Sequence, residues 1–231
     1  MVKHISLVIT AVICSSLAAG ICSASPLTDY SQGKTAVNIN WFPNLQMKDH
    51  SSYPSFTGSA INDTVNANGK RGNFDWSLTT GLGGNWAIQY RQFNPKSRSS
   101  DISKFGMKTQ EVNVLYKLDK NVSAFSGWHQ GKYDFLSSGD TTTTSNKNTL
   151  QVGLVGITRL APKTQLYGVI GFGKDLENYE IGTSYALDKN LDFDLLYRYK
   201  KVKKLYNIEY NVHYHDDVTA KGLGCGITYK F

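Results

Sequence analysis

The amino-acid sequence predicts an all-β fold in which ten antiparallel strands close into a barrel. The first observation is the strict alternation of the last eleven residues, 221–231, which is typical of a strand with one apolar face. That face carries Leu223, Cys225, Ile227, Tyr229 and Phe231. The second observation is that short turn sequences and longer polar connections alternate along the chain.

Length and composition agree with one all-β domain. The chain has 231 residues with 21 Gly, 14 Tyr and 10 Phe, which suits short strands joined by turns. Its mean hydropathy of −0.34 argues against a bundle of membrane-spanning helices. The net charge is +7, but the basic residues are spread over separate loops. Because they form no single stripe, we expect no nucleic-acid partner.

Residues 1–24 have the pattern of a cleaved signal peptide. A charged start at Lys3 and His4 precedes an apolar stretch at 5–21, and Ala24 ends a small-residue cleavage site. An uncleaved anchor helix is the alternative, although serine and threonine dilute the apolar stretch. We therefore expect a mature domain of residues 25–231, in which Cys225 is alone and no disulfide forms.

The mature chain is then divided by its turn chemistry. A polar lead-in at 25–33 precedes a first strand at 34–42, and residues 43–72 are expected to form a surface loop. Four short turns follow, at 83–85, 119–121, 161–163 and 188–190. Longer polar connections separate them, at 94–106, 132–148, around 175–178 and at 200–220. Four short turns imply five strands in each direction, and an eight-strand barrel is the alternative if one hairpin fails.

The apolar faces also predict the register of each hairpin. The matching registers place Leu187 opposite Leu191, Leu118 opposite Val122, Leu160 opposite Thr164, and Leu82 opposite Trp86. On the polar face, these registers put Glu180 beside Arg198 and Glu111 beside His129. A slip of one residue would exchange the two faces, so the agreement between hairpins is informative.

Aromatic residues near the strand ends indicate a membrane environment for the apolar face. Trp41, Trp76 and Trp128 gather toward one end of the strands, and Trp86, Tyr229 and Phe231 toward the other. Two such belts match the two interfaces of a membrane. In a transmembrane barrel the apolar row faces lipid and the polar row faces the lumen. We therefore expect short periplasmic turns and longer extracellular loops.

Over most of residues 25–231 the pattern resembles small outer-membrane β-barrel proteins of the broad OmpA-like class. The specific motif is the terminal strand, with Leu223, Ile227, Tyr229 and Phe231, which resembles the signal read by the barrel-assembly machinery. The resemblance implies a bacterial outer membrane in a Gram-negative-type envelope, and contact with outer-membrane lipids including lipopolysaccharide. It also implies a cell-surface protein, either structural, adhesive or a small, weakly selective, porin-like pore. No wall-binding domain follows Phe231, so a wall-anchoring role is not expected. The oligomeric state is left open.

Charged residues of the polar row are the first candidate site. The expected lumen pairs are Glu180 with Arg198, Glu111 with His129, and Asp75 with Arg91. Such pairs form either a selectivity ring, a general-base dyad or a plug of paired side chains, and a narrow ten-strand lumen favours the plug. Glycines at 222, 224 and 226 leave room either for large neighbours or for a thin water path.

The segment near residue 215 supplies candidates for catalysis, namely His213, His215, Asp216 and Asp217. Two histidines without a third assured ligand do not predict a metal site, and no cofactor is expected. A hydrolase acting at the extracellular rim, either a protease or a lipid A-modifying enzyme, remains the alternative function. The residues do not match the pattern of omptin-type proteases one by one.

Two groups of basic residues are expected at the external surface. One comprises Lys200, Lys201, Lys203 and Lys204, and the other Lys96, Arg98 and Lys104. Such residues either bind phosphates of lipopolysaccharide or another polyanion, or form a solvated surface.

Overall fold

A computed structural model describes residues 27–54, 60–70, 72–98, 103–137, 140–143, 146–209 and 212–231, and most of these residues lie in β-strands. The strands are β1 (Thr35–Phe42), β2 (Gln46–Pro54), β3 (Ala60–Asn68), β4 (Asn73–Gly83), β5 (Trp86–Phe93), β6 (Ser103–Lys117), β7 (Val122–Ser137), β8 (Asp140–Thr143), β9 (Lys147–Ala161), β10 (Thr164–Gly173), β11 (Leu176–Ala186), β12 (Leu191–Glu209) and β13 (Val212–Lys230). No described segment forms a helix that is long and apolar enough to cross a membrane.

Within the described chain, ten strands form the predicted closed antiparallel barrel, in the order β1-β4-β5-β6-β7-β9-β10-β11-β12-β13. The last strand closes the barrel on the first, as expected, with Val37 opposite Tyr229. The amide of Phe231 donates a 2.8 Å hydrogen bond to the carbonyl of Thr35. Each of these ten strands is paired on both sides, as hydrocarbon requires of a spanning sheet.

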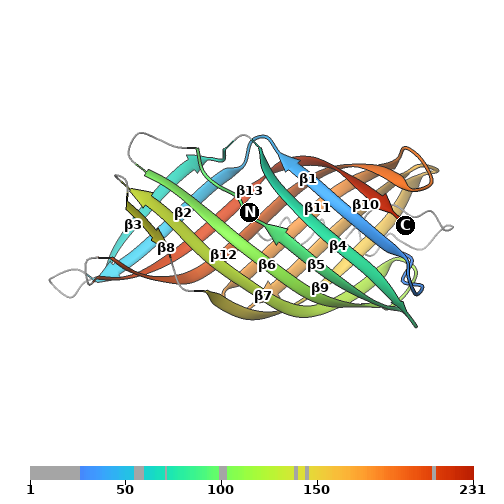
Figure 1. The fold of residues 1–231 in the computed structure, drawn as a ribbon, viewed down its shortest axis with the longest axis horizontal. Coiled ribbons are helices and arrows are strands. Elements are labelled where there is room, and N and C mark those ends of the chain that lie inside the picture. Colours follow the sequence, from blue (N-terminus) through green and yellow to red (C-terminus); the bar gives the residue numbers. More distant parts are fainter. Residues whose placement is uncertain are drawn as a thin grey trace.

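Short turns and long hairpins lie at opposite ends of the barrel (Figure 1). The C-terminus and the short turns lie at one end, at the right of the view, which we call the turn end. The tips of β2, β3, β8 and the β12–β13 hairpin lie at the other end, which we call the hairpin end. Along the strands the predicted register is confirmed in all four hairpins, including Glu180 opposite Arg198 and Glu111 opposite His129. Next to two turns a bulge shifts the pairing by one residue, so that Trp86 is opposite Gly83 instead of Leu82, and Thr164 is opposite Ala161 instead of Leu160.

Large apolar side chains point outward from the barrel, as a membrane environment requires. The outward apolar belt includes Ile39, Leu78, Ile88, Val114, Leu150, Val152, Phe193, Leu195, Leu223 and Ile227, all at least partly exposed. Aromatic pairs border this belt at both ends, with Trp76 against Tyr90 and Trp86 against Tyr116. An outward apolar surface is the reverse of a soluble barrel and is typical of transmembrane barrels.

The expectation of a surface loop at 43–72 is wrong. This stretch contains β2 and β3, an antiparallel hairpin that continues β1 and β4 beyond the apolar belt. The outer half of β13 also pairs with β2, so the hairpin is part of the sheet. The strands here lack an apolar row because neither outward nor inward positions face hydrocarbon. Periodicity therefore gave no signal for them.

The polar connections expected at 132–148 and 200–220 are also largely strand. Strand β7 has 16 residues, and β12 and β13 have 19 each. About 9–11 residues suffice for a tilted strand to cross a bilayer, so these strands rise well beyond the membrane. By contrast, β10 and β11 are joined by a tight turn at Lys174 and Asp175. The wall at the hairpin end is therefore uneven in height.

The expected polar lead-in closes the turn end of the lumen. Leu27 and Tyr30 are buried, and the hydroxyl of Tyr30 donates to Ser123 Oγ at 3.1 Å. Lys117 Nζ donates to the carbonyl of Thr28 at 2.7 Å. Gly81 allows this approach, because a Cβ there would lie 2.4 Å from the carbonyl oxygen of Ser31. Residues 27–33 thus fold into the mouth of the barrel.

Candidate functional site

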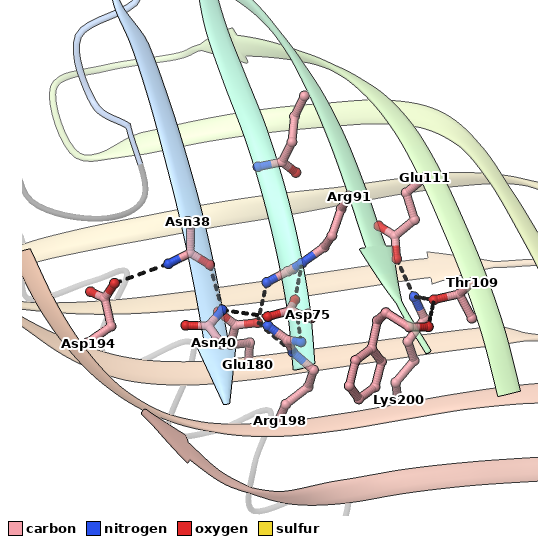
Figure 2. Close-up of polar contacts among 12 residues, drawn as sticks. Asn38, Asn40, Asp75, Arg91, Thr109, Glu111, Glu180, Asp194, Arg198 and Lys200 are labelled. Carbon is pink, nitrogen blue, oxygen red and sulfur yellow. Dashed lines mark hydrogen bonds and ion pairs between the residues drawn. The ribbon is translucent and has the colours of Figure 1, made fainter. Parts of the chain in front are cut away.

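Four charged side chains from four strands meet in the middle of the lumen. Asp75 comes from β4, Arg91 from β5, Glu180 from β11 and Arg198 from β12. Arg198 contacts Asp75 at 2.6 Å and Glu180 at 2.7 Å, and Arg91 contacts the same two carboxylates at 3.1 and 2.9 Å. Figure 2 shows the resulting network, in which two guanidinium groups lie between two carboxylates. We call these four residues the central quartet.

Rings and amides complete the surroundings of the central quartet. The guanidinium of Arg198 lies 4.9 Å from the ring centre of Phe42 and 5.1 Å from that of Phe93. Asn40 Nδ2 donates to Asp75 Oδ1 at 2.6 Å. Buried charges are tolerated only when they are paired and hydrogen-bonded, and both conditions are met here.

A second ion pair joins Glu111 of β6 to Lys200 of β12. Lys200 was expected in an external basic edge, and this is wrong, because its side chain is only 2% exposed inside the lumen. It lies two positions after Arg198 on the same strand, so it shares the inward face. Its ammonium also donates to Thr109 Oγ1 at 3.2 Å (Figure 2). His129 is the buried cross-strand neighbour of Glu111, but the ion partner of Glu111 is Lys200.

A third polar group fills the lumen nearer the turn end. Asp194 accepts hydrogen bonds from Asn38 Nδ2 at 3.1 Å and from Thr228 Oγ1 at 2.7 Å. Asp192 forms an ion pair with Lys230 on the neighbouring strand. The polar row predicted from the sequence therefore lies inside the barrel, where its members bind one another.

Toward the hairpin end the lumen is filled by apolar side chains. Buried members of this layer are Phe42, Leu45, Met47, Phe93, Phe105, Met107, Val202 and Leu205. Inward-facing glycines leave room for large rings, as Gly224 on β13 and Gly182 on β11 show. A Cβ at Gly224 would lie 2.6 Å from the Phe42 ring, and one at Gly182 would lie 2.6 Å from the Tyr167 ring. The space beside these two glycines is therefore occupied by rings.

A small cavity lies beside the central quartet. A cavity of about 50 Å³ lies among residues that include Leu27, Arg91, Tyr167 and Glu180. A space of this size holds at most a few water molecules. The described side chains thus form a polar core between an apolar layer at the hairpin end and the folded lead-in at the turn end.

The catalytic candidates lie in the outer half of β13, where His215 and Asp217 share one face of the strand and Asp216 lies on the other. The side chain of His213 lies outside the described residues. His215 is exposed with its ring centre 5.7 Å from that of Tyr206, and Asp217 contacts Lys201 at 2.9 Å. Asp216 is buried and accepts a 2.7 Å hydrogen bond from Ser51 Oγ. Among described residues no group of three His, Cys, Asp or Glu side chains has a geometry suited to a metal ion.

A further buried acid, Asp49, has no counterpart in the sequence-based expectations. It lies on β2 and accepts a hydrogen bond from the hydroxyl of Tyr133 on β7, across the lumen at the hairpin end. Burial raises the pKa of Asp49 to about 7, with the hydrogen bond from Tyr133 opposing the shift and the charge of Asp216 adding to it. Residues 43–72 show no apolar alternation, so the sequence alone could not assign Asp49 to a strand or to the lumen.

Comparison with known proteins gives structural neighbours only. No family model matches the sequence, and no curated protein sequence matches it. The outer-membrane protease OmpT from Escherichia coli is similar in fold, with a TM-score of 0.54 at 11% identity over 91% of this chain and 99% of that one. This chain has the fold of a small outer-membrane β-barrel. At such low identity the likeness shows the shared fold alone.

Two other solved structures are more distant in shape. Neisserial surface protein A has a TM-score of 0.41 and 17% identity, over 87% of this chain and 100% of that one. The attachment invasion locus protein Ail of Yersinia pestis has a TM-score of 0.30 and 14% identity, over 84% of this chain and 99% of that one.

Proposed function

We propose that this outer-membrane barrel is a non-conducting surface protein, with a structural or adhesive role rather than a transport role. The observation that carries the proposal is the filled lumen. The central quartet crosses it, rings pack against the quartet, and a cavity beside Arg91 and Glu180 measures only about 50 Å³. A water-filled channel would require several buried ion pairs to separate, and each separated charge would be costly in a narrow lumen.

The tall hairpins support a role at the cell surface. The outer parts of β2, β3, β12 and β13 form one continuous sheet beyond the apolar belt. The outward face of this sheet is polar, which suits contact with envelope components or with another cell. Export through the signal peptide at 1–24 and assembly through the strand ending at Phe231 are parts of this proposal.

An enzymatic role has less support from the geometry. His215 and Asp217 share the outward face of β13, whereas Asp216 faces inward. A general base and its partner need hydrogen-bond reach of one another and of a substrate. The described positions of these three residues do not provide such a cluster.

A liposome-swelling assay with sugars of graded size tests the proposal. The folded protein is reconstituted at the same protein-to-lipid ratio as a general porin, and folding is verified by the mobility difference between boiled and unboiled samples. We expect swelling no faster than that of protein-free liposomes, while the porin gives size-dependent swelling. Size-dependent swelling by this protein would refute the non-conducting assignment.

A further inference from the structure

The outward face of the sheet at the hairpin end is hollowed. A groove of about 700 Å³ lies over β12, β13, β2 and β3, outside the lumen. Its lining includes Gln46, Lys48, His50, Thr64, Asn66 and Asn68 from the β2–β3 hairpin. The other wall is formed by Tyr199, Lys201, Asp217, Thr219 and Lys221 from β12 and β13. We call this feature the basic groove.

The strand registers arrange the groove residues in rows. Lys201 of β12 is opposite Thr219 of β13, which is opposite Lys48 of β2. In the adjacent row, Tyr199 is opposite Lys221, and Lys221 is opposite Gln46. Residues in register on neighbouring strands lie about 5 Å apart, so both rows present their side chains to one small area.

The charges in the groove are mostly positive. Three lysines line it against one aspartate. Lys201 contacts that aspartate, Asp217, at 2.9 Å. Lys48 and Lys221 have no ion-pair partner among the residues that the structure describes. Two lysines are therefore available for an anionic ligand, and amide and hydroxyl side chains surround them.

The groove begins where the outward apolar belt ends. Lys221 lies two positions from Leu223, whose exposed fraction is 62%. Tyr199 lies two positions from Tyr197 on β12, and the next outward residue, Leu195, is 51% exposed. Two positions along a strand correspond to about 7 Å, so the lysines lie at the depth of lipid headgroups. The belt below the groove is the surface that acyl chains cover.

We infer that the basic groove binds the phosphorylated headgroup of a glycolipid in the surrounding leaflet. This inference rests on the proposed orientation of the barrel, with its hairpin end toward the outside of the cell. Lys48 and Lys221 bind phosphate, while Gln46, Asn66 and Thr219 bind sugar hydroxyls. The acyl chains of the same lipid pack on Leu223 and Leu195. A groove of several hundred Å³ accommodates a sugar phosphate.

Native mass spectrometry of the folded protein in detergent tests the inference, because it detects the lipid A that stays bound. The probes are bisphosphorylated lipid A, its dephosphorylated form, inorganic phosphate and heparin. The groove variant combines Lys48→Gln, Lys201→Gln and Lys221→Gln. The control variant makes the same charge change at exposed turn-end lysines, by Lys120→Gln, Lys163→Gln and Lys189→Gln. Both variants must show the heat-dependent mobility of the folded barrel.

We expect the wild-type protein and the control variant to retain bisphosphorylated lipid A equally. Each lysine near a charged membrane surface contributes about fivefold to affinity, so the groove variant should bind at least tenfold more weakly. Binding should also weaken with added salt and with the dephosphorylated lipid. Equal loss in both triple variants would overturn the inference, and so would equal binding of the dephosphorylated lipid.

Binding of heparin or inorganic phosphate in the groove at the same affinity would also overturn the assignment to a lipid, in favour of a soluble anion. These results are independent of solute flux. A swelling assay that reveals a pore would refute the non-conducting role without changing the expected lipid binding. If lipid A did not bind, the non-conducting assignment would still stand.

Discussion

Arg198 Nη1 and Asp75 Oδ2 lie 2.6 Å apart across the lumen, although 123 positions separate the two residues in the chain. This contact joins β12 to β4, strands that do not neighbour one another in the sheet. It forms only when the barrel has closed, and it places a paired charge in the path that a solute would follow. We therefore expect the ion-pair network both to increase the free energy of unfolding of the barrel and to obstruct its lumen.

Replacing Arg198 with methionine should destabilise the folded barrel strongly. The change keeps side-chain volume but leaves Asp75 and Glu180 to share Arg91. Removing one partner of a buried ion pair costs about 3–5 kcal/mol. The free energy of unfolding in urea, measured in lipid vesicles, should fall by about this amount, whereas Lys189→Met at an exposed turn should change it by less than about 0.5 kcal/mol.

Adding Glu180→Gln to Arg198→Met should recover part of the loss, because Arg91 and Asp75 then remain as a balanced pair. If Arg198→Met alone were as stable as the wild-type protein, the central quartet would have no structural role.

Gly182 and Tyr167 should show energetic coupling. They are directly opposite on β11 and β10, and the Tyr167 ring covers the glycine. Gly182→Val should destabilise the barrel by about 1–3 kcal/mol, because the new side chain overlaps the ring. In the Tyr167→Ala background the same change should cost much less. A double-mutant cycle on unfolding free energies measures the coupling, and strictly additive values would show that the ring does not fill this space.

The raised pKa of Asp49 predicts that packing of the β2–β3 hairpin against the barrel wall, where Tyr133 donates to Asp49, depends on pH. The pKa of this carboxyl is raised to about 7, whereas an unfolded aspartate titrates near 3.9. The docked state therefore binds the proton more tightly, so docking is strongest below about pH 4, weakens as the pH rises toward about 7, and is constant above. Hydrogen exchange of residues 46–54, corrected for intrinsic rates, should show an opening constant at least about tenfold larger at about pH 8 than at about pH 5.

Asp49→Asn should remove this dependence, because the amide does not titrate. Asp63→Asn, at an exposed position on β3, is the matched control and should keep it. A pH dependence that persisted in Asp49→Asn would assign the effect to another group.

Lys147 should hold the outer part of β12 in place. Its ammonium donates to Asp175 Oδ2 at 2.8 Å and to the carbonyls of Lys203 and Lys204 at 2.8 and 3.1 Å. The register of β12 shifts between Val202 and Leu205, so these two carbonyls lie in a bulge. Lys147→Met should increase hydrogen exchange at residues 202–205 several-fold with little change in global stability. Lys174→Met, in the same region, should have no such effect, and equal exchange in both variants would exclude the clamp.

The sequence was sufficient for the features that depend on alternation. Apolar faces and turn chemistry predicted the ten strands, the four registers and the pairing of β13 with β1, and from these Glu180 opposite Arg198 follows directly. Contacts across the lumen, such as Arg198 with Asp75, were not predictable. They depend on strand tilt and on which walls face each other after closure.

Two wrong expectations have the same physical origin. Polar residues dominate residues 43–72 and also the stretch that begins at Lys200. Such composition alone favours external loops. Beyond the apolar belt a strand has no row of residues that faces lipid. Hydropathy therefore does not alternate along its sequence, and the strand cannot be recognised by its period of two. For Lys200 a signal did exist, since it continues the inward face of Arg198, and strand parity alone would have placed it in the lumen.

The proposed non-conducting role requires that the folded barrel has no aqueous path through its lumen. Single-channel recording in planar bilayers tests this most directly, using protein shown to be folded by its heat-dependent mobility and a general porin reconstituted in the same lipid as the positive control. We expect a baseline without discrete conductance steps, while the porin gives regular ones. Reproducible ohmic steps from the folded wild-type protein would contradict it.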